Sequence, residues 1–572
     1  MNQLGPDQLL AEASILVEKG ETIAALQRLQ DAVRLAPDQA RYWSHFGRAL
    51  KRAERFDEAC ACLVRAAALD PADIDCRSQL GHLASDLSRV DEAIRWHGEA
   101  LQRQPDSLML QLNHLFVLPL VASSLQEIEH CRQRLIEGLP ALLIDPSLRL
   151  YQGQEFGAHT FLLAYQGRND RAVLQAYGDL LSRFFGDSAR PGQDWLTAAN
   201  SSAPRHRIGF LSAYFYNHSN ARAFEGLIGG LDRDRFELVL LPLEGTPTDA
   251  FCRELQARCD RVVTVPQPLD AASKCLRGLG LDLLFFTDVG MHPLVSTLVS
   301  RRHAPVQVAG WGIPHTTGFA CIDHYISGDL VEPSGAQDHY GEKLVQLPGL
   351  PCRYLSRSLA LPPANLPKVR QYFLLPDDVR IFGCLQDFRK LHPDFDLVLE
   401  AIARRVPDAL FVFVEPGIPC LGQIFLDRIA NSAPTLAQRL VLLARMSRAE
   451  YMGLAGCLDL LLDPLHYGSG ITVFETMATG TPTITLEGNF LRSRFLAGAY
   501  RQMGLVDAPI ATSSEDYVEL AVAMMGNDAR RLALRERICQ AALLHLYDRI
   551  EMVRGFEDFA IEAIAQAKSR QS

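Results

Sequence analysis

The sequence predicts an α/β protein that begins with an all-α repeat region. Two observations support this prediction: prolines recur at one interval near the start of the chain, and short apolar runs alternate with helical segments from about residue 205. The chain has 572 residues, which suggests three or four domains at about 100–200 residues each. Hydrophobic residues make up 48% and charged residues 22%, which is ordinary for a globular protein and argues against a disordered chain.

The N-terminal region repeats every 34 residues, which is the tetratricopeptide period. This interval separates three prolines: Pro37, Pro71 and Pro105. Residues 40–73 fit the repeat pattern best, and Gly47 and Ala59 are small where two antiparallel helices would cross closely. Because one unit cannot bury its own apolar face, we predict a stacked tetratricopeptide superhelix over residues 1–120. We expect its concave face to bind protein, the alternative being a scaffold that only caps the next domain.

Residues 121–203 are predicted to form degenerate repeats or a helical adaptor. The sequence from 108 to 195 keeps helical periodicity, as in LQEIEHCRQRLIEGL, but loses the 34-residue interval.

Two parallel α/β lobes are predicted next, at residues 204–370 and 371–572. Apolar runs of the first include RHRIGFLSAYF, FELVLLPL, DRVVTVPQ, LDLLFFTDVG, VQVAGWG and CIDHYISGD. Those of the second are VRIFGCLQDF, DALFVFVEP, RLVLLAR, CLDLLLDP and TPTITL, after a Pro- and Leu-rich linker at 351–376. Such runs, joined by helical segments, indicate two Rossmann-like lobes with a ligand cleft between them. Neither lobe has Gly-x-Gly-x-x-Gly after its first strand and the chain has no Walker loop, which argues against a dehydrogenase and an ATPase.

The segment DPLHYGSGITVFETMATGTPTITL, residues 463–486, is the most informative for ligand binding. We expect a strand to end at Asp463, a glycine-rich turn to follow at 468–470, and a helix to start near Ile471 or Thr472. Small residues let backbone N–H groups approach a ligand, and a helix N-terminus favours an anion, so a diphosphate fits here. Glu475, one turn inside the helix, is expected to accept hydrogen bonds from ribose hydroxyls.

Several motifs resemble the catalytic region of protein O-GlcNAc transferases. They are IGFLSAYFYNHS (208–219), RRHAPVQVAGWGIPHTTG (301–318), CIDHYISGD (321–329), GCLQDFRKLHP (383–393) and the 463–486 segment, in the expected order behind tetratricopeptide repeats. The resemblance covers nearly the whole chain. It implies a two-Rossmann glycosyltransferase of the GT-B fold that takes UDP-GlcNAc as its donor.

The resemblance also assigns two catalytic residues. His218 matches the family histidine beside the donor sugar and is a candidate base, since imidazole suits neutral pH; the alternative is a histidine that caps the following helix. Lys390 matches the family lysine that neutralises the leaving UDP, because charge grows on the β-phosphate as the glycosidic bond breaks. Arg389 is its neighbour, and either side chain could point inward.

Further positions are expected to bind substrate. Arg448 and Tyr451 match positions around the uracil and ribose, where a tyrosine can stack on uridine, and Asp288 and His292 end another strand at the cleft. Two residues depart from the family turn, since Gly470 and Ile471 stand where a histidine and a threonine usually contact the diphosphate. The full predicted substrate-binding set is Arg448, Tyr451, Gly468, Ser469, Gly470, Ile471, Thr472, Glu475, His315, Thr316, Thr317 and Asp288.

No metal and no cofactor are expected. Asp394 and Asp396 have the Asp-x-Asp spacing of metal-dependent glycosyltransferases, but they follow a proline at a predicted helix start, where N-capping explains them better.

The predicted function is inverting transfer of GlcNAc from UDP-GlcNAc to Ser or Thr of a protein acceptor bound along the repeats and cleft. The alternatives are protein O-fucosyl or N-glucosyl transfer by the same fold, or a catalytically weak repeat-based adaptor. The net charge of -10 argues against nucleic-acid partners. We expect no membrane partner, since the apolar runs are only strand length, and the 13 scattered cysteines and the lack of a signal peptide favour the cytoplasm. A C-terminal helix over IEMVRGFEDFAIEAIAQAK is expected to pack back on the first lobe, as in similar enzymes.

Overall fold

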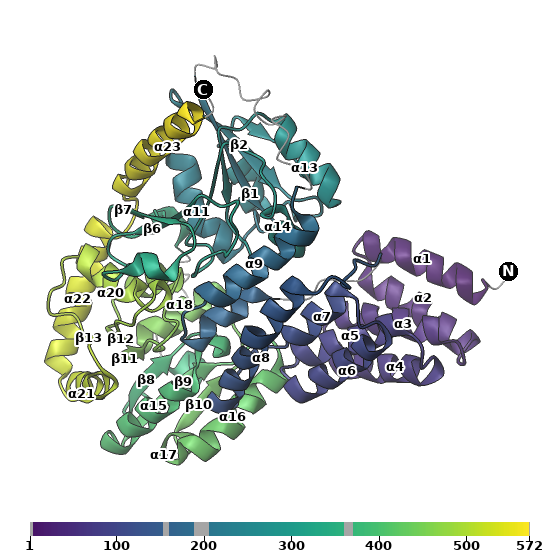
Figure 1. The fold of residues 1–572 in the computed structure, drawn as a ribbon. Helices are drawn as coiled ribbons and strands as arrows, with labels where there is room; N and C mark the ends of the chain where they lie inside the picture. The colour runs from purple at the N-terminus through teal and green to yellow at the C-terminus, as the bar shows by residue number, and fades with distance from the viewer. Residues whose placement is uncertain (1–3, 153–158, 188–204, 360–369, 571–572) are drawn as a thin grey trace. The chain divides into compact units, whose positions relative to one another are not determined.

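The computed structural model describes residues 4–152, 159–187, 205–359 and 370–570. The chain forms two compact units, one of residues 1–120 and 128–158 and one of residues 121–127 and 159–572. The helices and strands of both units are labelled in Figure 1. No helix among the described residues is long and apolar enough to cross a membrane.

The first unit is built from antiparallel helix pairs, as the 34-residue interval predicts. Each of Pro37, Pro71 and Pro105 lies in the turn that separates one pair from the next. A Cβ added to Gly47 would lie 2.7 Å from the Leu63 side chain and 3.2 Å from the Ala59 carbonyl oxygen, which explains the small residues at this crossing. The helices are α1 (Pro6–Glu18), α2 (Thr22–Leu35), α3 (Ala40–Arg52), α4 (Phe56–Leu69), α5 (Ile74–Asp86), α6 (Val90–Arg103), α7 (Leu108–Leu115) and α8 (Leu125–Ile144).

The first lobe of the second unit contains a seven-stranded parallel sheet in the order β3-β2-β1-β4-β5-β6-β7. Its central strands are buried throughout, as expected for a sheet with helices on both faces. The strands are β1 (His206–Ser212), β2 (Phe236–Pro242), β3 (Arg261–Val262), β4 (Leu283–Phe286), β5 (Val306–Gly310), β6 (His324–Gly328) and β7 (Lys343–Leu347). Six of these coincide with the predicted apolar runs, whereas β7 was not predicted because its residues are only partly buried.

The second lobe contains a six-stranded parallel sheet in the order β10-β9-β8-β11-β12-β13. The order reverses between β8 and β11, as it does between β1 and β4 in the first lobe, and this doubly wound arrangement confirms the two Rossmann-like lobes. The strands are β8 (Arg380–Cys384), β9 (Ala409–Val414), β10 (Leu440–Leu443), β11 (Leu460–Leu462), β12 (Thr483–Leu486) and β13 (Ile510–Ala511).

The remaining helices of the second unit connect and cover these strands. The α-helices are α9 (Arg171–Phe185), α11 (Ser219–Gly230), α12 (Ala250–Gln256), α13 (Leu269–Gly278), α14 (Pro293–Leu298), α15 (Pro393–Arg405), α16 (Pro419–Ser432), α17 (Pro434–Ala437), α18 (Arg448–Cys457), α19 (Thr472–Met477), α20 (Phe495–Gln502), α21 (Ser514–Met525), α22 (Asp528–His545) and α23 (Glu551–Ser569). Short 3-10 turns are η1 (Thr160–Gln166), η2 (Ala336–His339), η3 (Ser356–Ser358), η4 (Arg370–Phe373), η5 (Phe388–Lys390) and η6 (Leu491–Ser493).

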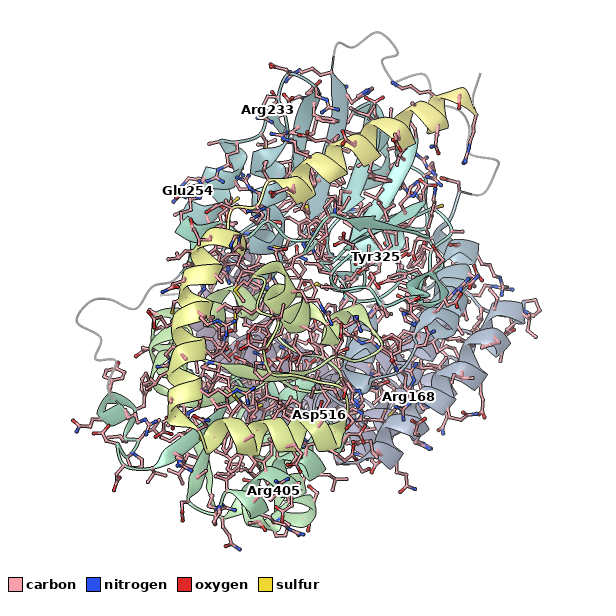
Figure 2. The ribbon with its side chains drawn as sticks, turned by 90° about the vertical axis from the view of Figure 1, so that its left-hand side faces the viewer. Arg168, Arg233, Glu254, Tyr325, Arg405 and Asp516 are labelled. Carbon is pink, nitrogen blue, oxygen red and sulfur yellow. The ribbon has the colours of Figure 1, made fainter. Side chains whose placement is uncertain are left out.

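The C-terminal helix α23 packs on the first lobe, although α22 before it belongs to the second (Figure 1). Its buried Glu557 accepts hydrogen bonds from the Asp232 N–H and from Arg235, and Lys568 pairs with Asp282 at 3.0 Å. Figure 2 shows this helix crossing the first lobe, which carries Arg233 and Glu254, while Arg405 and Asp516 lie in the second lobe.

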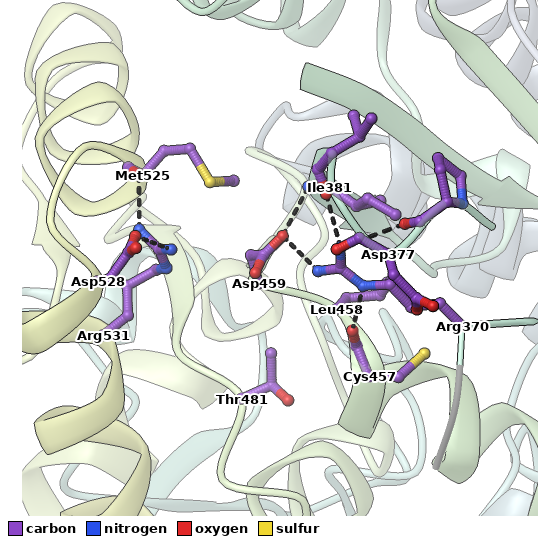
Figure 3. A network of polar contacts seen from close by, with 12 residues as sticks. Arg370, Asp377, Ile381, Cys457, Leu458, Asp459, Thr481, Met525, Asp528 and Arg531 are labelled. Carbon is purple, nitrogen blue, oxygen red and sulfur yellow. Dashed lines mark hydrogen bonds and ion pairs between the residues drawn. The ribbon is translucent and has the colours of Figure 1, made fainter. Parts of the chain in front are cut away.

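An arginine network anchors the start of the second lobe (Figure 3). The Arg370 guanidinium pairs with Asp459 at 2.6 Å and donates to the Cys457 carbonyl oxygen. Asp459 in turn accepts the Ile381 N–H at 2.7 Å, so Arg370, near the end of the linker, is tied to both β8 and the end of α18.

Candidate functional site

The candidate residues gather where the two sheets reverse their strand order. His218 follows β1, Asp288 follows β4, Lys390 follows β8 and the glycine-rich turn follows β11. These are the carboxyl ends of the strands on either side of each reversal, which is where open α/β sheets bind ligands.

Lys390 joins the two loops of the second lobe. Its Nζ donates to Gln386 Oε1 at 2.9 Å and to the Gly468 carbonyl oxygen at 3.0 Å, and it lies 4.7 Å from the centre of the Tyr467 ring. Burial lowers the pKa of Lys390 to about 8, although Asp463 and Asp387 oppose that shift. The neighbouring Arg389 is exposed and pairs with Asp387, so the lysine is the cation that faces the turn.

The turn after β11 is held by the buried carboxylate of Asp463. Asp463 Oδ1 accepts both the backbone N–H and the hydroxyl of Ser469 at 2.7 Å, and Oδ2 accepts the Thr485 hydroxyl at 2.9 Å. A Cβ on Gly468 would lie 2.3 Å from Asp463 Oδ2, so this position requires glycine. The sequence therefore places a tight, carboxylate-braced turn directly before α19.

The turn leaves backbone donors open at the start of α19. Among the described residues, the N–H groups of Gly470 and Ile471 donate to no partner, and a Cβ on Gly470 would meet nothing within 4 Å. The helix begins at Thr472, as predicted, and its first turn adds a partial positive charge. Open donors, a helix N-terminus and the Lys390 ammonium together make a site suited to an anion.

Gln386 is a member of this site that the motif analysis did not single out. Its amide nitrogen donates to the hydroxyls of Ser469 at 3.0 Å and Thr472 at 3.2 Å, while its oxygen accepts from Lys390. The signal was present, since Gln386 lies two residues after β8 in the LQDFRK motif.

Arg448 and Glu475 lie together, but they bind each other and the linker. Arg448 Nε pairs with Glu475 Oε1 at 2.5 Å, and its Nη2 donates to the Tyr354 hydroxyl and to the Ser358 carbonyl oxygen. The Tyr354 hydroxyl also donates to Glu475 at 3.3 Å, and its ring stacks on Phe474. Tyr354 was not predicted, because nothing in the linker sequence shows which lobe it contacts.

Tyr451 packs against the apolar core of the second lobe. It contacts the cluster that includes Leu454 and Leu458, and its buried hydroxyl has no hydrogen-bond partner among the residues that the structure describes. Burial raises the pKa of this hydroxyl, whereas the residue as a whole is only partly buried, and stacking of its ring on uridine stays a prediction.

His218 caps the helix that follows it. Its Nδ1 accepts the Asn220 N–H at 3.2 Å at the start of α11, and its ring lies 4.7 Å from that of Tyr214. Burial, and then the charge of Arg222, lower the pKa of His218 and favour the neutral imidazole. Because Nδ1 accepts, the neutral ring carries its proton on Nε2.

Asp288 is fully buried, and its carboxylate braces the turn between β1 and α11. Oδ2 accepts the Ala213 N–H at 3.0 Å, and Oδ1 accepts from the Thr287 hydroxyl. Burial raises the pKa of Asp288 to about 7. This carboxylate supports the start of the β1–α11 turn and is not exposed to a ligand, and His292 caps α14 through the Leu294 N–H.

The HTTG motif surrounds a second buried carboxylate. The hydroxyls of Thr316 and Thr317 donate to Glu342, which also accepts the Thr317 N–H at 2.7 Å. His315 is buried and its Nδ1 contacts the Thr316 carbonyl oxygen at 2.8 Å. Arg492 of the second lobe reaches the Pro314 carbonyl oxygen, so the two lobes meet beside this motif.

The prediction that Asp394 and Asp396 cap α15 is wrong. The N-cap is His392, whose Nδ1 accepts the Asp394 N–H at 3.2 Å. Asp394 Oδ2 instead lies 2.8 Å from His466 Nε2, and the buried Asp396 forms an ion pair with Arg428. His392 can act as the cap because its Nδ1 reaches the Asp394 N–H at the first turn of the helix. The carboxylates of Asp394 and Asp396 then pair with side chains.

Comparison with known sequences identifies relatives of this chain. The sequence pattern of glycosyl transferase family 41 matches residues 181–350 and 360–548. The probable UDP-N-acetylglucosamine--peptide N-acetylglucosaminyltransferase SEC of Arabidopsis thaliana is 24% identical over 62% of this chain and 36% of its own length. The corresponding SPINDLY protein of Petunia hybrida is 24% identical over 70% of this chain and 43% of its own length. The chain thus spans less than half the length of these curated relatives.

One solved structure shares the fold along nearly the full chain. A mutant O-GlcNAc transferase of Thermobaculum terrenum superposes with a TM-score of 0.73 at 21% sequence identity, covering 99% of this chain and 98% of its own. This similarity supports helical repeats followed by two Rossmann-like lobes.

Proposed function

The chain belongs to glycosyl transferase family 41, and on that premise we propose that it transfers GlcNAc from UDP-GlcNAc to Ser or Thr hydroxyls of proteins with inversion. The SEC and SPINDLY relatives carry UDP-N-acetylglucosamine--peptide transferase in their names, which supports this donor and a protein acceptor. The acceptor would bind along the tetratricopeptide repeats and the lobes.

The observation that carries the proposal is the anion site at the reversal of the second sheet. Lys390 Nζ lies within hydrogen-bond distance of the Gly468 carbonyl oxygen, beside the open N–H groups of Gly470 and Ile471. When the glycosidic bond breaks, the leaving diphosphate gains negative charge, and a fixed ammonium with oriented donors stabilises that charge most in the transition state. Gln386 holds the lysine in this position.

His218 is proposed to position the sugar or the acceptor through its Nε2–H. The capping bond to Nδ1 makes Nε2 a donor, so the imidazole as held here cannot take a proton at Nε2. Service as a general base would require the cap to break or the tautomer to exchange. The helix cap and the active-site assignment are therefore compatible, whereas a base role is less favoured.

Diphosphate binding is proposed to need no metal and no cofactor, because the lysine and the helix N-terminus supply the positive charge. A cytoplasmic location is also proposed, and the 13 free cysteines support a reducing compartment.

A second candidate function is N-glucosyl transfer by the same site. A relative named UDP-glucose:protein N-beta-glucosyltransferase, from Actinobacillus pleuropneumoniae, is 24% identical over 48% of this chain and 43% of its own length. Protein O-fucosyl transfer and a catalytically weak, repeat-based adaptor are less favoured, because no relative described above carries either role in its name.

Calorimetric titration with UDP, UDP-GlcNAc, UDP-glucose and GDP, without added metal, tests the proposal. We expect UDP and UDP-GlcNAc to bind and GDP not to bind, with transfer to protein then detected by mass spectrometry. Tight GDP binding would overturn the donor assignment, tighter binding of UDP-glucose would favour the second candidate, and the absence of all binding would favour an adaptor.

A further inference from the structure

We propose that His392, Asp394 and His466 form a binding site for one divalent transition-metal ion, with Zn²⁺ as the best match. The three residues come from two loops of the second lobe, at the start of α15 and directly after β11. This site is separate from the proposed anion site and goes beyond the proposed function.

The distances between the three side chains fit a small tetrahedral ion. Asp394 Oδ2 lies 2.8 Å from His466 Nε2 and 3.3 Å from His392 Nδ1, and the three ligand atoms all lie within 4.8 Å of one another. Bonds of about 2.0–2.2 Å in a tetrahedral zinc site place neighbouring ligand atoms about 3.3–3.5 Å apart. The side chains therefore need to move by only a fraction of their present separations to enclose the ion.

The ligand types favour Zn²⁺ over Mg²⁺ or Ca²⁺. Two imidazoles and one carboxylate suit zinc and its neighbours in the first transition series, whereas magnesium and calcium take oxygen ligands. A fourth position would be filled by water. All three protein ligands lie in one lobe, so the site does not depend on closure of the lobes.

Both histidines have a ring nitrogen directed at Asp394. His392 Nδ1 lies 3.3 Å from Asp394 Oδ2 and now accepts the Asp394 N–H as the cap of α15, so an ion bound at Nδ1 would replace this capping hydrogen bond. His466 Nε2 lies 2.8 Å from Asp394 Oδ2, and the metal ion would take the place of the hydrogen bond between these two atoms.

The site is closed on one side and open on the other. The His392 side chain is 1% exposed, whereas those of Asp394 and His466 are 36% and 27% exposed. An ion and its water can therefore enter beside Asp394 while His392 holds it against the lobe.

The ion would fasten the two loops of the proposed anion site. His392 lies two residues after Lys390, and His466 lies two residues before Gly468. Lys390 and Gly468 are themselves hydrogen-bonded, so the metal would fix the relative positions of their two loops. The ion would do so without contacting a bound nucleotide. UDP is accordingly expected to bind the metal-free chain as well.

Cobalt binding to the full-length chain tests the proposal. After chelator treatment and dialysis, titration with Co²⁺ is expected to saturate the site with one ion per chain, with the visible absorption of nitrogen and oxygen ligands and without thiolate charge-transfer bands. Zn²⁺ should displace the cobalt and raise the melting temperature. Two variants remove a ligand: Asp394→Asn, which can still accept the His466 hydrogen bond, and His466→Gln.

Each ligand variant is expected to weaken Co²⁺ binding by at least the roughly 10- to 100-fold that loss of an outer-shell partner costs. His545→Ala, at an exposed histidine on α22, should bind as the parent does. Unchanged affinity in both ligand variants, thiolate bands, or no saturable binding would overturn the proposal and leave the cluster as hydrogen bonds alone. UDP calorimetry on the same samples tests the proposed function independently.

Discussion

Asp288 offers a prediction whose magnitude follows from burial. The carboxyl is fully buried, and its pKa rises from an ordinary 3.8 to about 7 in the folded protein. That difference corresponds to about 4 kcal/mol between the two protonation states. Below about pH 4 the group is protonated in both the folded and the unfolded chain, so it contributes no pH dependence there.

Between about pH 4 and pH 7 the folded chain keeps the Asp288 proton while the unfolded chain loses it. Stability therefore falls as pH rises through this window, by as much as about 4 kcal/mol, and becomes flat above it. Asp288→Asn cannot ionise and can still accept the Ala213 N–H. As pH rises from 5 to 8, we therefore expect the Asp288→Asn variant to become progressively more stable relative to the parent.

The assay should report on the first lobe alone, because a chain of two units need not unfold in one step. Hydrogen exchange of the amides in β1 and β4, compared between parent and variant at each pH, gives the local free energy of opening. Asp234→Asn, at an exposed aspartate in the same lobe, is the matched control and should run parallel to the parent. Parallel profiles for Asp288→Asn and the parent would refute the argument that this carboxyl is held protonated near neutral pH.

Three further predictions concern the second lobe and its contacts. Lys390→Met removes the cation beside Gly468 and should weaken UDP binding in calorimetry by about 10- to 150-fold, since a charged hydrogen bond contributes about 1.5–3 kcal/mol. Arg389→Met is the control, because it loses the pairing with Asp387 and the contact with the Tyr165 ring but no contact with the turn. Equal losses in both variants would contradict the assignment. Gly468→Ala places a Cβ 2.3 Å from Asp463 Oδ2 and should cost about 1–3 kcal/mol of stability in urea unfolding, whereas Gly470→Ala meets no atom within 4 Å and should be tolerated. A larger loss for Gly470→Ala would mean that the turn is not placed as described. Asp170→Ala removes the carboxylate that pairs with the buried Arg492 and should destabilise the second unit by about 3–5 kcal/mol, measured by thermal or urea unfolding; a change below about 1 kcal/mol would show that this pair is solvated in solution.

The parts of the molecule that follow from local pattern were predicted from the sequence. The 34-residue interval requires stacked helix pairs, and the small Gly47 marks a helix crossing that the structure contains. Apolar runs of strand length predicted the central strands of both sheets, because residues buried on both faces must be apolar along their whole length. The glycine-rich turn and the start of α19 at Thr472 were also predicted, because the residues that favour a turn or begin a helix are neighbours along the chain.

The partners of polar side chains depended on contacts distant in sequence. Asp463 and Ser469 are close in sequence, but Glu475 and Tyr354 meet only because the linker passes beside α19. The packing of Tyr451 against the lobe core and the burial of Asp288 behind the β1 turn likewise depend on segments distant in sequence. The chain between α8 and β1 shows the same limit, because its helical periodicity does not reveal that η1 and α9 group with the lobes.

By itself, the sequence determined the order of the repeats and lobes, the position of the glycine-rich turn and the residue types available there, because these depend on periodicity and on neighbours along the chain. Only the tertiary structure decided which of those residues line the turn and which brace the fold. Lys390 faces the turn, and Asp394 lies between two histidines. His218 caps a helix through Nδ1, which leaves the ring proton on Nε2. A side chain's role is set by its burial and by the donors and acceptors packed around it, and those come from segments that only folding brings together.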